Sequence, residues 1–419
     1  MVPSAKRSGK KTGLMVAGIQ GNNGSTLAAF LAMDTMHPTN SNNDLPDFPG
    51  SIVRHGTVKS TRRPVRDFLI VPQTIPIGGW DVRTIQPWET ILKQNEVLNA
   101  QQIDLAAPML QATVSILPGI FLPGFVNLPE EDGVDAIVEE LPVYQDGLDR
   151  LINDIDSFAV DNNLEHVVVI YSGCTEKNIE WTFDNILSWP PSVYYAAAAL
   201  KTKVSCSFAN ASAQISTSSQ MAAAFDQQGR ICLGNFDLKT GQTKFKGLML
   251  DYLFSCGFPP IYVASSNYLS NRDGYNLKPG TGGQNESKIK TKSSMLEECR
   301  SQRPGSNQNQ SIAHSVTIDY LEGSGDNKLA LDEYSFGLAF GGKTAMSIRT
   351  VCPDTFLAIP LLYDLTIWLS LMTGTMTSER ASSLLAYYFK CTRYCKSHFL
   401  LEQLEELTEW CGTYEPKTP

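Results

Sequence analysis

The glycine-rich segment near the N-terminus constrains the fold of this chain more than any other feature. An apolar run over residues 13–19 leads into Gly18-Ile-Gln-Gly21-Asn-Asn-Gly24, and an alanine-rich apolar segment follows over residues 27–33. A buried strand, a glycine turn and a buried helix in that order open a nucleotide-binding βαβ unit, whose helix start attracts phosphate. A tight turn without a ligand remains an alternative, because Gln20 stands where a strict GxGxxG pattern has its second glycine.

The following segments extend this unit into an α/β sheet. Residues 166–171 (HVVVIY) are apolar enough for a strand buried on both faces, and Ser172-Gly-Cys-Thr175 follows at the strand end, where ligands bind in open α/β sheets. Residues 35–50 are expected to form a surface loop. The pattern between residues 90 and 160 is helical, with breaks expected at its prolines, Pro108, Pro118 and Pro123.

The pattern changes after residue 241. We expect a helix over residues 245–252 and strands over residues 261–264, 315–320 and 345–349, with a low-complexity loop at residues 301–311. The apolar region from about residue 356 is expected to pack back on the first domain. The predicted fold is therefore α/β, with a Rossmann-type domain (residues 1–243 and 357–419) interrupted by an inserted α+β domain (residues 244–356).

Composition excludes several classes of function. A chain of 419 residues with 42% hydrophobic residues can form two cores, and its net charge of −9 speaks against a nucleic-acid partner. The longest apolar stretch, residues 356–372, contains Pro360 and Asp364 and is shorter than the roughly 20 residues of a membrane span, so we expect a buried helix and no membrane partner. Nine unpaired cysteines and five scattered histidines predict a cytoplasmic protein with reduced thiols and no zinc site.

Lysines and aspartates carry the strongest chemical signal. Lys288, Lys290 and Lys292 lie close enough for some to share a face, Lys328 follows in Gly-Asp-Asn-Lys, and Lys390 comes after three aromatic residues. A buried ammonium has a lowered pKa and can exchange protons near neutral pH. Surface lysines exposed to solvent, or lysines and aspartates that only neutralise one another, are the alternatives. The accompanying carboxylates are those of Asp237, Asp273, Asp326 and Asp354.

Three further segments are candidates for ligand contacts. Residues 240–243 (TGQT) open an expected helix whose amides and hydroxyls could hold a phosphate. Asp81, in Gly-Gly-Trp-Asp after an expected tight turn, could accept hydrogen bonds from a ribose, although a plain turn is the commoner meaning of such a segment. Residues 210–214 (NASAQ) form a polar loop that is open to the same two interpretations.

Taken together, these segments resemble the myo-inositol-3-phosphate synthase family. The resemblance covers roughly residues 12–390, and its most specific parts are residues 237–246 (DLKTGQTKFK) and 325–334 (GDNKLALDEY). It implies an inositol-3-phosphate synthase of inositol and phospholipid biosynthesis, which converts D-glucose 6-phosphate into 1D-myo-inositol 3-phosphate. The implied steps are oxidation at C5 with NAD, enolisation, intramolecular aldol closure and re-reduction. A homotetramer built through the inserted domain, and a monovalent or divalent cation, belong to the same expectation.

The resemblance also implies roles for individual residues. Catalysis would fall to Lys288, Lys328, Lys390, Asp237 and Asp273, with Lys390 taking the C5 hydroxyl proton. Substrate would be held by Thr240, Gly241, Gln242, Thr243, Lys292, Asn267 and Asn271. NAD would be held by Gly18, Gly21, Asn22, Asn23, Gly24, Asp81, Ser172, Thr175, Ser212, Asp237, Asp326 and Asp354.

Several positions depart from the family pattern. Gln20 and Phe236 replace residues typical of the family, as do residues 172–174, Ala211, Ala213 and Arg272, and the segment from residue 391 onward lies outside the resemblance. These changes motivate an alternative, a catalytically impaired NAD-binding homologue that acts as a structural or regulatory oligomer. A simple dehydrogenase that releases NADH is a third hypothesis.

Overall fold

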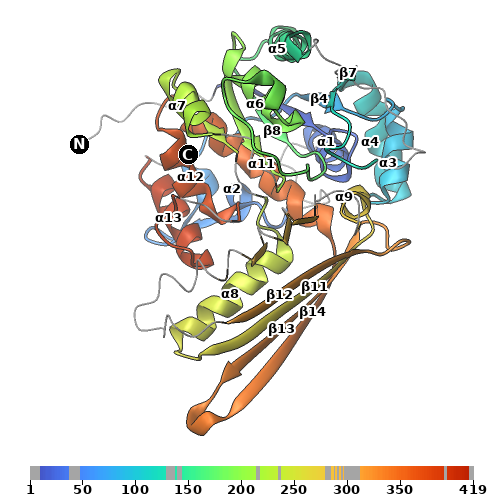
Figure 1. Cartoon of the computed structure of the whole chain (residues 1–419). Coiled ribbons are helices and arrows are strands. Elements are labelled where there is room, and N and C mark those ends of the chain that lie inside the picture. The colour runs from blue at the N-terminus through green and yellow to red at the C-terminus, as the bar shows by residue number, and fades with distance from the viewer. Residues whose placement is uncertain are drawn as a thin grey trace.

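The computed structural model shows a parallel α/β unit and a projecting sheet (Figure 1). It describes residues 10–36, 48–128, 137–138, 144–213, 218–234, 237–278, 285–286, 288–289, 292–293, 296, 312–390 and 394–414. The expected loop at residues 301–311, Phe236 and most of the loop at residues 35–50 lie outside these ranges.

Six parallel strands form the central sheet, in the order β10-β9-β8-β1-β4-β5. The chain starts in the middle at β1, fills one side and then returns to fill the other, so the strand order reverses between β1 and β8. Ligands bind at such a reversal, at the carboxyl ends of the strands. The strands are β1 (Thr12–Ala17), β4 (Ile77–Asp81), β5 (Ile116–Pro118), β8 (His166–Tyr171), β9 (Ser205–Asn210) and β10 (Cys232–Leu233).

Helices cover both faces of this sheet, which is why β1 and β8 are buried along their whole length. Leu14 and Val16 of β1 point into one core, while Met15 and Ala17 point into the other. The first core includes residues of α1 (Asn22–Met36), α3 (Trp88–Asn95), α4 (Ala100–Thr113) and α11 (Asp354–Met372). The second includes residues of α5 (Tyr144–Asp161), α6 (Pro191–Lys201) and α7 (Ser219–Gln227).

Shorter elements complete the unit. The helices are α2 (Ile52–His55), α12 (Ser378–Leu384) and α13 (Leu400–Gly412), with 3₁₀ turns η1 (Val65–Phe68), η3 (Ile186–Ser188) and η5 (Leu385–Tyr387). The strands are β2 (Thr57–Val58), β3 (Arg63–Pro64), β6 (Ile120–Phe121) and β7 (Ile137–Val138).

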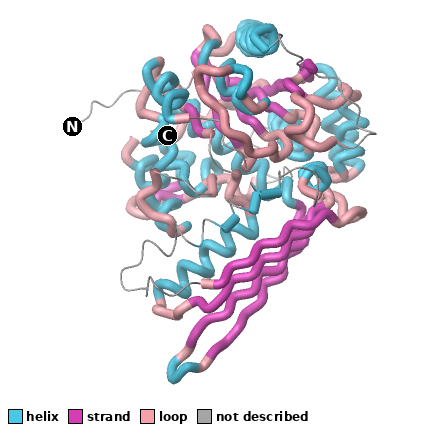
Figure 2. The backbone as a smooth tube through the Cα atoms, in the orientation of Figure 1, coloured by secondary structure: helices cyan, strands magenta, loops and turns pink. Residues whose placement is uncertain are grey.

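A second, four-stranded sheet projects from the first unit (Figure 2). Its order is β12-β11-β13-β14, with β11 parallel to β12 and the other pairs antiparallel. Helix α8 (Gly241–Ser255) packs Leu250 and Leu253 against Val263 and Tyr334 of this sheet. The strands are β11 (Pro260–Leu269), β12 (Ala313–Tyr320), β13 (Asn327–Gly337) and β14 (Lys343–Pro353), accompanied by α9 (Arg272–Asn276) and η4 (Ala339–Gly341).

The predicted α/β class with a Rossmann-type sheet and a second mixed sheet is confirmed, while two local expectations were wrong and one strand was not predicted. Helix α4 runs through Pro108, since a proline removes one hydrogen bond but the buried face and a capping box at Asn99 keep the helix intact. Gly-Gly-Trp-Asp is the end of strand β4, where a Cβ on Gly79 would meet the Val16 backbone, and no turn precedes Asp81 there. Residues 327–337 form strand β13, which the sequence pattern did not predict.

Helix α11 is long and apolar enough to cross a membrane, but 78% of its most apolar 18-residue stretch is buried inside the protein. This agrees with the expected buried helix that packs back on the first unit. The boundaries predicted for the two domains stay a prediction.

Candidate active site

A cavity that is partly open to solvent, with about 930 Å³ of space inside and at its mouth, lies between the two sheets, at the reversal of strand order. Its lining includes the loops that follow β1 and β8 and side chains from the second sheet and its helices. The predicted site residues that line it are Gly21, Asn22, Asn23, Ser172, Ser212, Asp237, Thr240, Asn271, Asp273, Lys288, Lys292, Lys328, Asp354 and Lys390.

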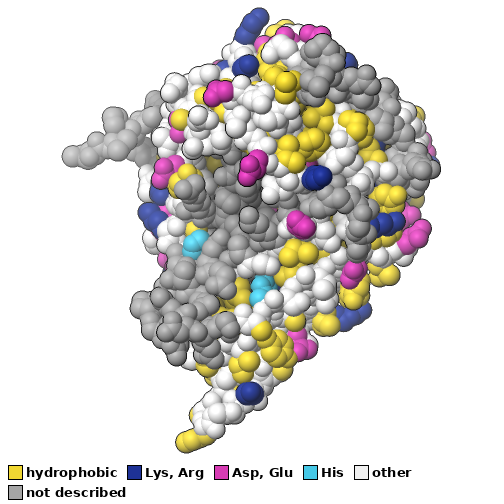
Figure 3. Space-filling view, in the orientation of Figure 1, with side chains coloured by type: hydrophobic (Ala, Val, Ile, Leu, Met, Phe, Trp, Pro, Cys, Tyr) yellow, Lys and Arg dark blue, Asp and Glu magenta, His cyan; other side chains and the backbone are white. Residues whose placement is uncertain are grey.

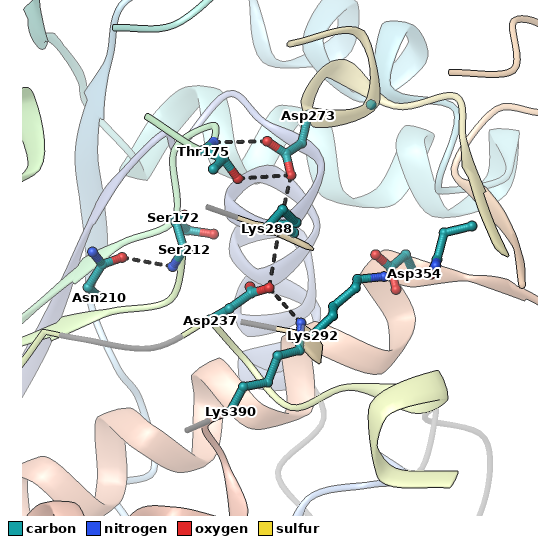
Figure 4. Close-up of polar contacts among 12 residues, drawn as sticks. Ser172, Thr175, Asn210, Ser212, Asp237, Asp273, Lys288, Lys292, Asp354 and Lys390 are labelled. Atoms are coloured by element: carbon teal, nitrogen blue, oxygen red, sulfur yellow. Dashed lines mark hydrogen bonds and ion pairs between the residues drawn. The ribbon is translucent and has the colours of Figure 1, made fainter. Parts of the chain in front are cut away.

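Asp237 lies at the centre of the lysine cluster (Figure 4). One of its oxygens, Oδ2, is 2.5 Å from Lys390 Nζ and 3.4 Å from Lys288 Nζ. Burial alone would raise the pKa of Asp237, but the ammonium groups of Lys288 and Lys390 hold it well below its usual range. Burial lowers the pKa of Lys390 despite its contact with Asp237. Lys390 is therefore a buried amine that can exchange a proton with its surroundings.

Asp273 and Asp354 form ion pairs with Lys288 and Lys328, respectively. Lys288 Nζ lies 3.0 Å from Asp273 Oδ2, and Asp237 and Asp273 together raise the pKa of Lys288 in spite of its burial. Thr175 donates its backbone N–H to Asp273 over 2.9 Å, so Thr175 orients this carboxylate. Lys328 Nζ lies 3.5 Å from Asp354 Oδ1 at the start of α11. The two carboxylates that face Lys288 keep its ammonium group charged at the cavity wall.

Lys292 has a different environment. Among the residues that the structure describes, its Nζ contacts two neutral amide oxygens, Asn267 Oδ1 at 2.5 Å and Gln242 Oε1 at 3.4 Å, and forms no ion pair. Burial, followed by the charges of Lys328 and Lys390, lowers its pKa well below the ordinary value. An anion that entered the cavity beside Lys292 would supply the missing negative charge.

A second cavity that is partly open to solvent, with about 690 Å³ of space inside and at its mouth, adjoins the first. Both are lined by Gly21, by Arg272 and by the loop of residues 172–174. The second cavity extends past Gly18, whose φ of +90° permits the turn after β1, to Asp81. Asp81 ends the strand beside β1, which is the position where a carboxylate accepts hydrogen bonds from a dinucleotide ribose.

Hydrogen bonds from the buried side chain of Asn95 fix the turn between β1 and α1. Asn95 donates its Nδ2 to the Gln20 carbonyl over 2.8 Å and to Ser25 Oγ over 2.7 Å. The Gln20 side chain is buried and accepts the Gln86 backbone N–H over 3.1 Å. A Cβ on Gly24 would lie 2.6 Å from the Ile19 Cα, so this glycine lets the helix approach the strand closely. The Gln20 side chain therefore does not block the N-terminus of α1, which faces the cavity.

Several predicted site residues lie behind the cavity wall. Asp326 accepts hydrogen bonds from Asn22 Nδ2 over 2.8 Å and from the Thr355 backbone over 3.0 Å, and so joins the first turn of α1 to that of α11. These residues can act through the side chains that they hold or through backbone groups. The members of this set are Gly24, Thr175, Gly241, Gln242, Thr243, Asn267 and Asp326.

The residues present fit a dinucleotide. Two adjoining cavities meet at the N-terminus of α1, and the carboxylate of Asp81 lies at the ribose position of the second one. Cys174 lines both cavities, but burial raises the pKa of its thiol to about 12, which argues against a nucleophilic role. The described residues contain no group of three or more His, Cys, Asp or Glu side chains that could hold a metal ion, and the expected cation has no support here.

Sequence reasoning missed four residues of the site. Asp332 accepts Gln242 Nε2 over 3.0 Å and thereby turns the Gln242 oxygen towards Lys292. Asn95 and Arg272 are joined by a hydrogen bond of 3.0 Å beside the glycine turn, and Arg83 contacts Asp81. Arg83 follows Gly-Gly-Trp-Asp by two residues, which is the one local signal that could have revealed it.

Comparison with known proteins agrees with this geometry. The family model described as Myo-inositol-1-phosphate synthase matches residues 12–411. The chain belongs to this family. Its match includes all but the last residue of α13, so the expectation that the resemblance ends before residue 391 was wrong for residues 391–411. The family model also carries an NAD-binding designation.

Two curated relatives are named inositol-3-phosphate synthase. The inositol-3-phosphate synthase of Saccharomyces cerevisiae is 29% identical over 395 residues, which cover 85% of this chain and 73% of that protein. The inositol-3-phosphate synthase of Trypanosoma brucei brucei is 30% identical over 399 residues, covering 88% and 74%. These relatives confirm the predicted enzyme class for this member of the myo-inositol-1-phosphate synthase family.

Solved structures support the fold. The inositol-3-phosphate synthase of Caenorhabditis elegans matches with a TM-score of 0.82 at 24% identity, covering 96% of this chain and 86% of that one. A myo-inositol-1-phosphate synthase-related protein from Thermotoga maritima matches with a TM-score of 0.67 at 18% identity, covering 98% and 100%.

Proposed function

We propose that this chain is an NAD-dependent inositol-3-phosphate synthase, which isomerises D-glucose 6-phosphate to 1D-myo-inositol 3-phosphate. One observation carries the proposal: Lys288, Lys292, Lys328 and Lys390 come from distant parts of the chain and line a single cavity. That cavity adjoins the fold's dinucleotide position at Gly21. A phosphorylated sugar that reacts beside a nicotinamide needs this combination of cations and dinucleotide site.

Phosphate binding is assigned to the start of α8 and to Lys292. Thr240 precedes the helix and its side chain makes no capping hydrogen bond, so the amides of the first turn are available for an anion. Lys292 and Lys328 line the same cavity and add ammonium donors. A phosphate held there fixes one end of the open-chain sugar, and the bent geometry favours ring closure by proximity.

Proton transfer and charge stabilisation are assigned to the remaining lysines. Lys390 takes the proton of the C5 hydroxyl as the sugar is oxidised, with Asp237 stabilising the ammonium that forms. When bound, the NAD/NADH couple would supply a hydride acceptor for this oxidation and a hydride donor for the later reduction. Lys288 and Lys328 stabilise negative charge on the sugar oxygens during enolisation and aldol closure. Fixed charges in a closed site can supply several kcal/mol of such stabilisation.

The proposal extends to assembly and location. The face of the four-stranded sheet opposite α8 exposes Leu331 and Val351. Phe340, at the turn between β13 and β14, is fully exposed, and Figure 3 shows hydrophobic side chains on this projecting part down to its tip. We infer that these surfaces join four copies of the chain in a cytoplasmic homotetramer.

Incubation of the pure protein with NAD and glucose 6-phosphate tests the activity. The synthase forms inositol phosphate, detected by phosphorus NMR and mass spectrometry, without accumulation of NADH. Accumulating NADH would identify a dehydrogenase. Absence of both products, with NAD binding retained, would identify an impaired homologue.

A further inference from the structure

A row of buried polar side chains lies between helix α8 and the second sheet, behind the wall of the first cavity. Gln242 and Lys246 are one turn apart on α8, and Ser265 on β11 is paired with Asp332 on β13 in the strand register. Each of the four residues is at most 5% exposed. Lys246, Ser265 and Asp332 are not among the described residues that line the cavity. They can therefore act on a ligand only through the side chains that they hold.

The hydrogen bonds of this row have a fixed direction. Lys246 Nζ donates to Ser265 Oγ over 2.5 Å, and Ser265 Oγ donates to Asp332 Oδ1 over 2.5 Å. The same Asp332 oxygen accepts Gln242 Nε2 over 3.0 Å. Because a carboxylate only accepts, the Gln242 amide must turn its NH₂ group to Asp332 and its oxygen to Lys292 Nζ, which lies 3.4 Å away. The orientation of Gln242 thus depends on Asp332.

Lys246 and Asp332 also balance each other's charge beside a group of cations. Lys246 Nζ lies 3.7 Å from Asp332 Oδ1. Burial lowers the pKa of Lys246, Asp332 raises it, and the charges of Lys390 and Lys328 lower it. Burial and neighbouring cations, Lys246 among them, hold the pKa of Lys292 well below its ordinary value. Loss of the Asp332 charge would make Lys292 harder to protonate, and loss of the Lys246 charge would make it easier.

We propose that Lys246 and Asp332 form a positioning pair for the phosphate end of the substrate. Asp332 fixes the Gln242 oxygen on Lys292, and the balanced charge of the pair lets the Lys292 ammonium form when a phosphate dianion binds. Neither member of the pair touches the substrate. The inference rests on the phosphate contact proposed for Lys292 and adds residues that set the strength of that contact.

Two further titratable groups face the pair and stay neutral between pH 7 and pH 9. Burial, followed by the charge of Lys246, lowers the pKa of His314 to about 4, although Asp332 raises it. Burial and the charge of Asp332 raise the pKa of Tyr334. The charged groups that act on Lys292 or respond to it are Lys328, Lys390, Lys246, Lys288, Asp237 and Asp354.

A double-mutant cycle on the full-length protein tests the pair. Calorimetry with glucose 6-phosphate, without added NAD, measures binding, and steady-state kinetics at saturating NAD measures KM and kcat. At pH 8 we expect Asp332→Asn to weaken binding and raise KM by about tenfold, with a smaller change in kcat, as one weakened charged hydrogen bond predicts. Lys246→Met should change both quantities in the opposite direction. The variant with both substitutions should return to within about threefold of the wild type.

The exposed ion pair of Lys93 and Glu89 provides the matched control. Glu89→Gln removes a carboxylate from a lysine on the surface of α3 and should leave the affinity for glucose 6-phosphate unchanged at every pH. A general effect of lost ion pairs would appear in this variant too.

The outcomes separate this inference from the proposed function. Weaker binding in all three pair variants, in parallel with lower melting temperatures, would reveal a role in folding alone and overturn the positioning pair. A folded Asp332→Asn with wild-type affinity and KM would also overturn it. If Asp332→Asn does not fold, the opposite effect of Lys246→Met and the recovery in the double variant still decide. A wild type that neither binds glucose 6-phosphate nor forms inositol phosphate would refute the proposed function itself.

Discussion

Asp237 decides how charge is distributed among the lysines of the cavity. It contacts Lys390 at 2.5 Å and Lys288 at 3.4 Å, whereas Lys292 is left with amide oxygens. The same residue type therefore occurs in two states. Lys288 keeps its charge because two carboxylates face it, and Lys292 has a strongly lowered pKa because it is buried and because other cations lie around it.

Lys390→Ala should abolish turnover while NAD binding persists. The reason is that this substitution removes the amine to which we assign exchange of the C5 hydroxyl proton, while the lining of the second cavity is unchanged. Steady-state kinetics and calorimetry with NAD measure the two effects separately. Unchanged turnover would refute the proton-transfer role, and Lys203→Ala, on the protein surface, is the control.

Lys292 should make substrate affinity depend on pH. Its lowered pKa means that the amine must gain a proton to pair with a phosphate dianion, which becomes harder as pH rises, so KM for glucose 6-phosphate should increase from pH 7 to pH 9. Lys292→Met should raise KM and remove most of this slope. Besides burial, the charged groups that lower the pKa of Lys292 are those of Lys328, Lys390, Lys246 and Lys288. The charge of Lys292 in turn lowers the pKa of Asp237 and Asp354. A wild-type KM that does not vary with pH would contradict the role.

At the scale of elements, one buried carboxylate joins three segments. Asp364 in α11 accepts the Ile52 N–H at the start of α2 over 2.5 Å, the Ser51 hydroxyl over 2.5 Å and the Tyr388 hydroxyl over 2.8 Å. Burial raises the pKa of Asp364 to about 6, because the hydrogen bonds only partly offset the loss of water. This contact also fixes the segment that leads to Lys390.

The pH dependence of stability should report on Asp364. A carboxyl whose folded pKa lies above its unfolded value contributes stability that is complete below about pH 4 and is lost as pH rises through about 6. The melting temperature of the wild type should therefore fall relative to that of Asp364→Asn between pH 4 and pH 8, by an amount that reflects roughly 2–3 kcal/mol. A constant difference between the two proteins across this range would refute the assignment. Glu176, whose pKa burial raises to about 7, titrates in both proteins and cancels.

At the scale of the whole molecule, the uncovered face of the second sheet is the surface that we propose for assembly. Strand β14 is exposed or half-buried at every residue, and Leu331 and Val351 are 42% and 53% exposed. A sheet face with exposed apolar side chains is typical of a surface that another protein surface covers.

Leu331→Asp should reduce the oligomer. A charge placed on the open face opposes its burial between copies, while the core beneath α8 is untouched. Analytical ultracentrifugation should show tetramers of the wild type and smaller species of the variant. A wild type that sediments as a monomer would exclude the proposed tetramer, and Val160→Asp, exposed on α5, should leave assembly unchanged.

The sequence alone predicted strands β1 and β8 and the buried helices α1 and α11, because their apolar runs are local and their lengths follow from burial, but it did not predict strands β4, β5, β9 and β10. It also identified the lysines and aspartates that line the first cavity. It did not predict β13, since Lys328 and Asp332 interrupt the apolar pattern of this strand to face the site. Gly-Gly-Trp-Asp was misread because glycine in a strand that another backbone approaches closely looks like glycine in a turn.

The amino-acid sequence by itself determined the parallel sheet, the buried α11 helix and the supply of charged side chains, since these depend on residue type and local order. Only the tertiary structure decided which charges meet. Asp237 and Lys390 are 153 positions apart, and Arg272 and Asn95 are 177 apart. A side chain's partner depends on where the folded chain places it, and this placement made Lys288 a paired cation, Lys292 a buried amine beside two amide oxygens, and Arg83 the neighbour of Asp81.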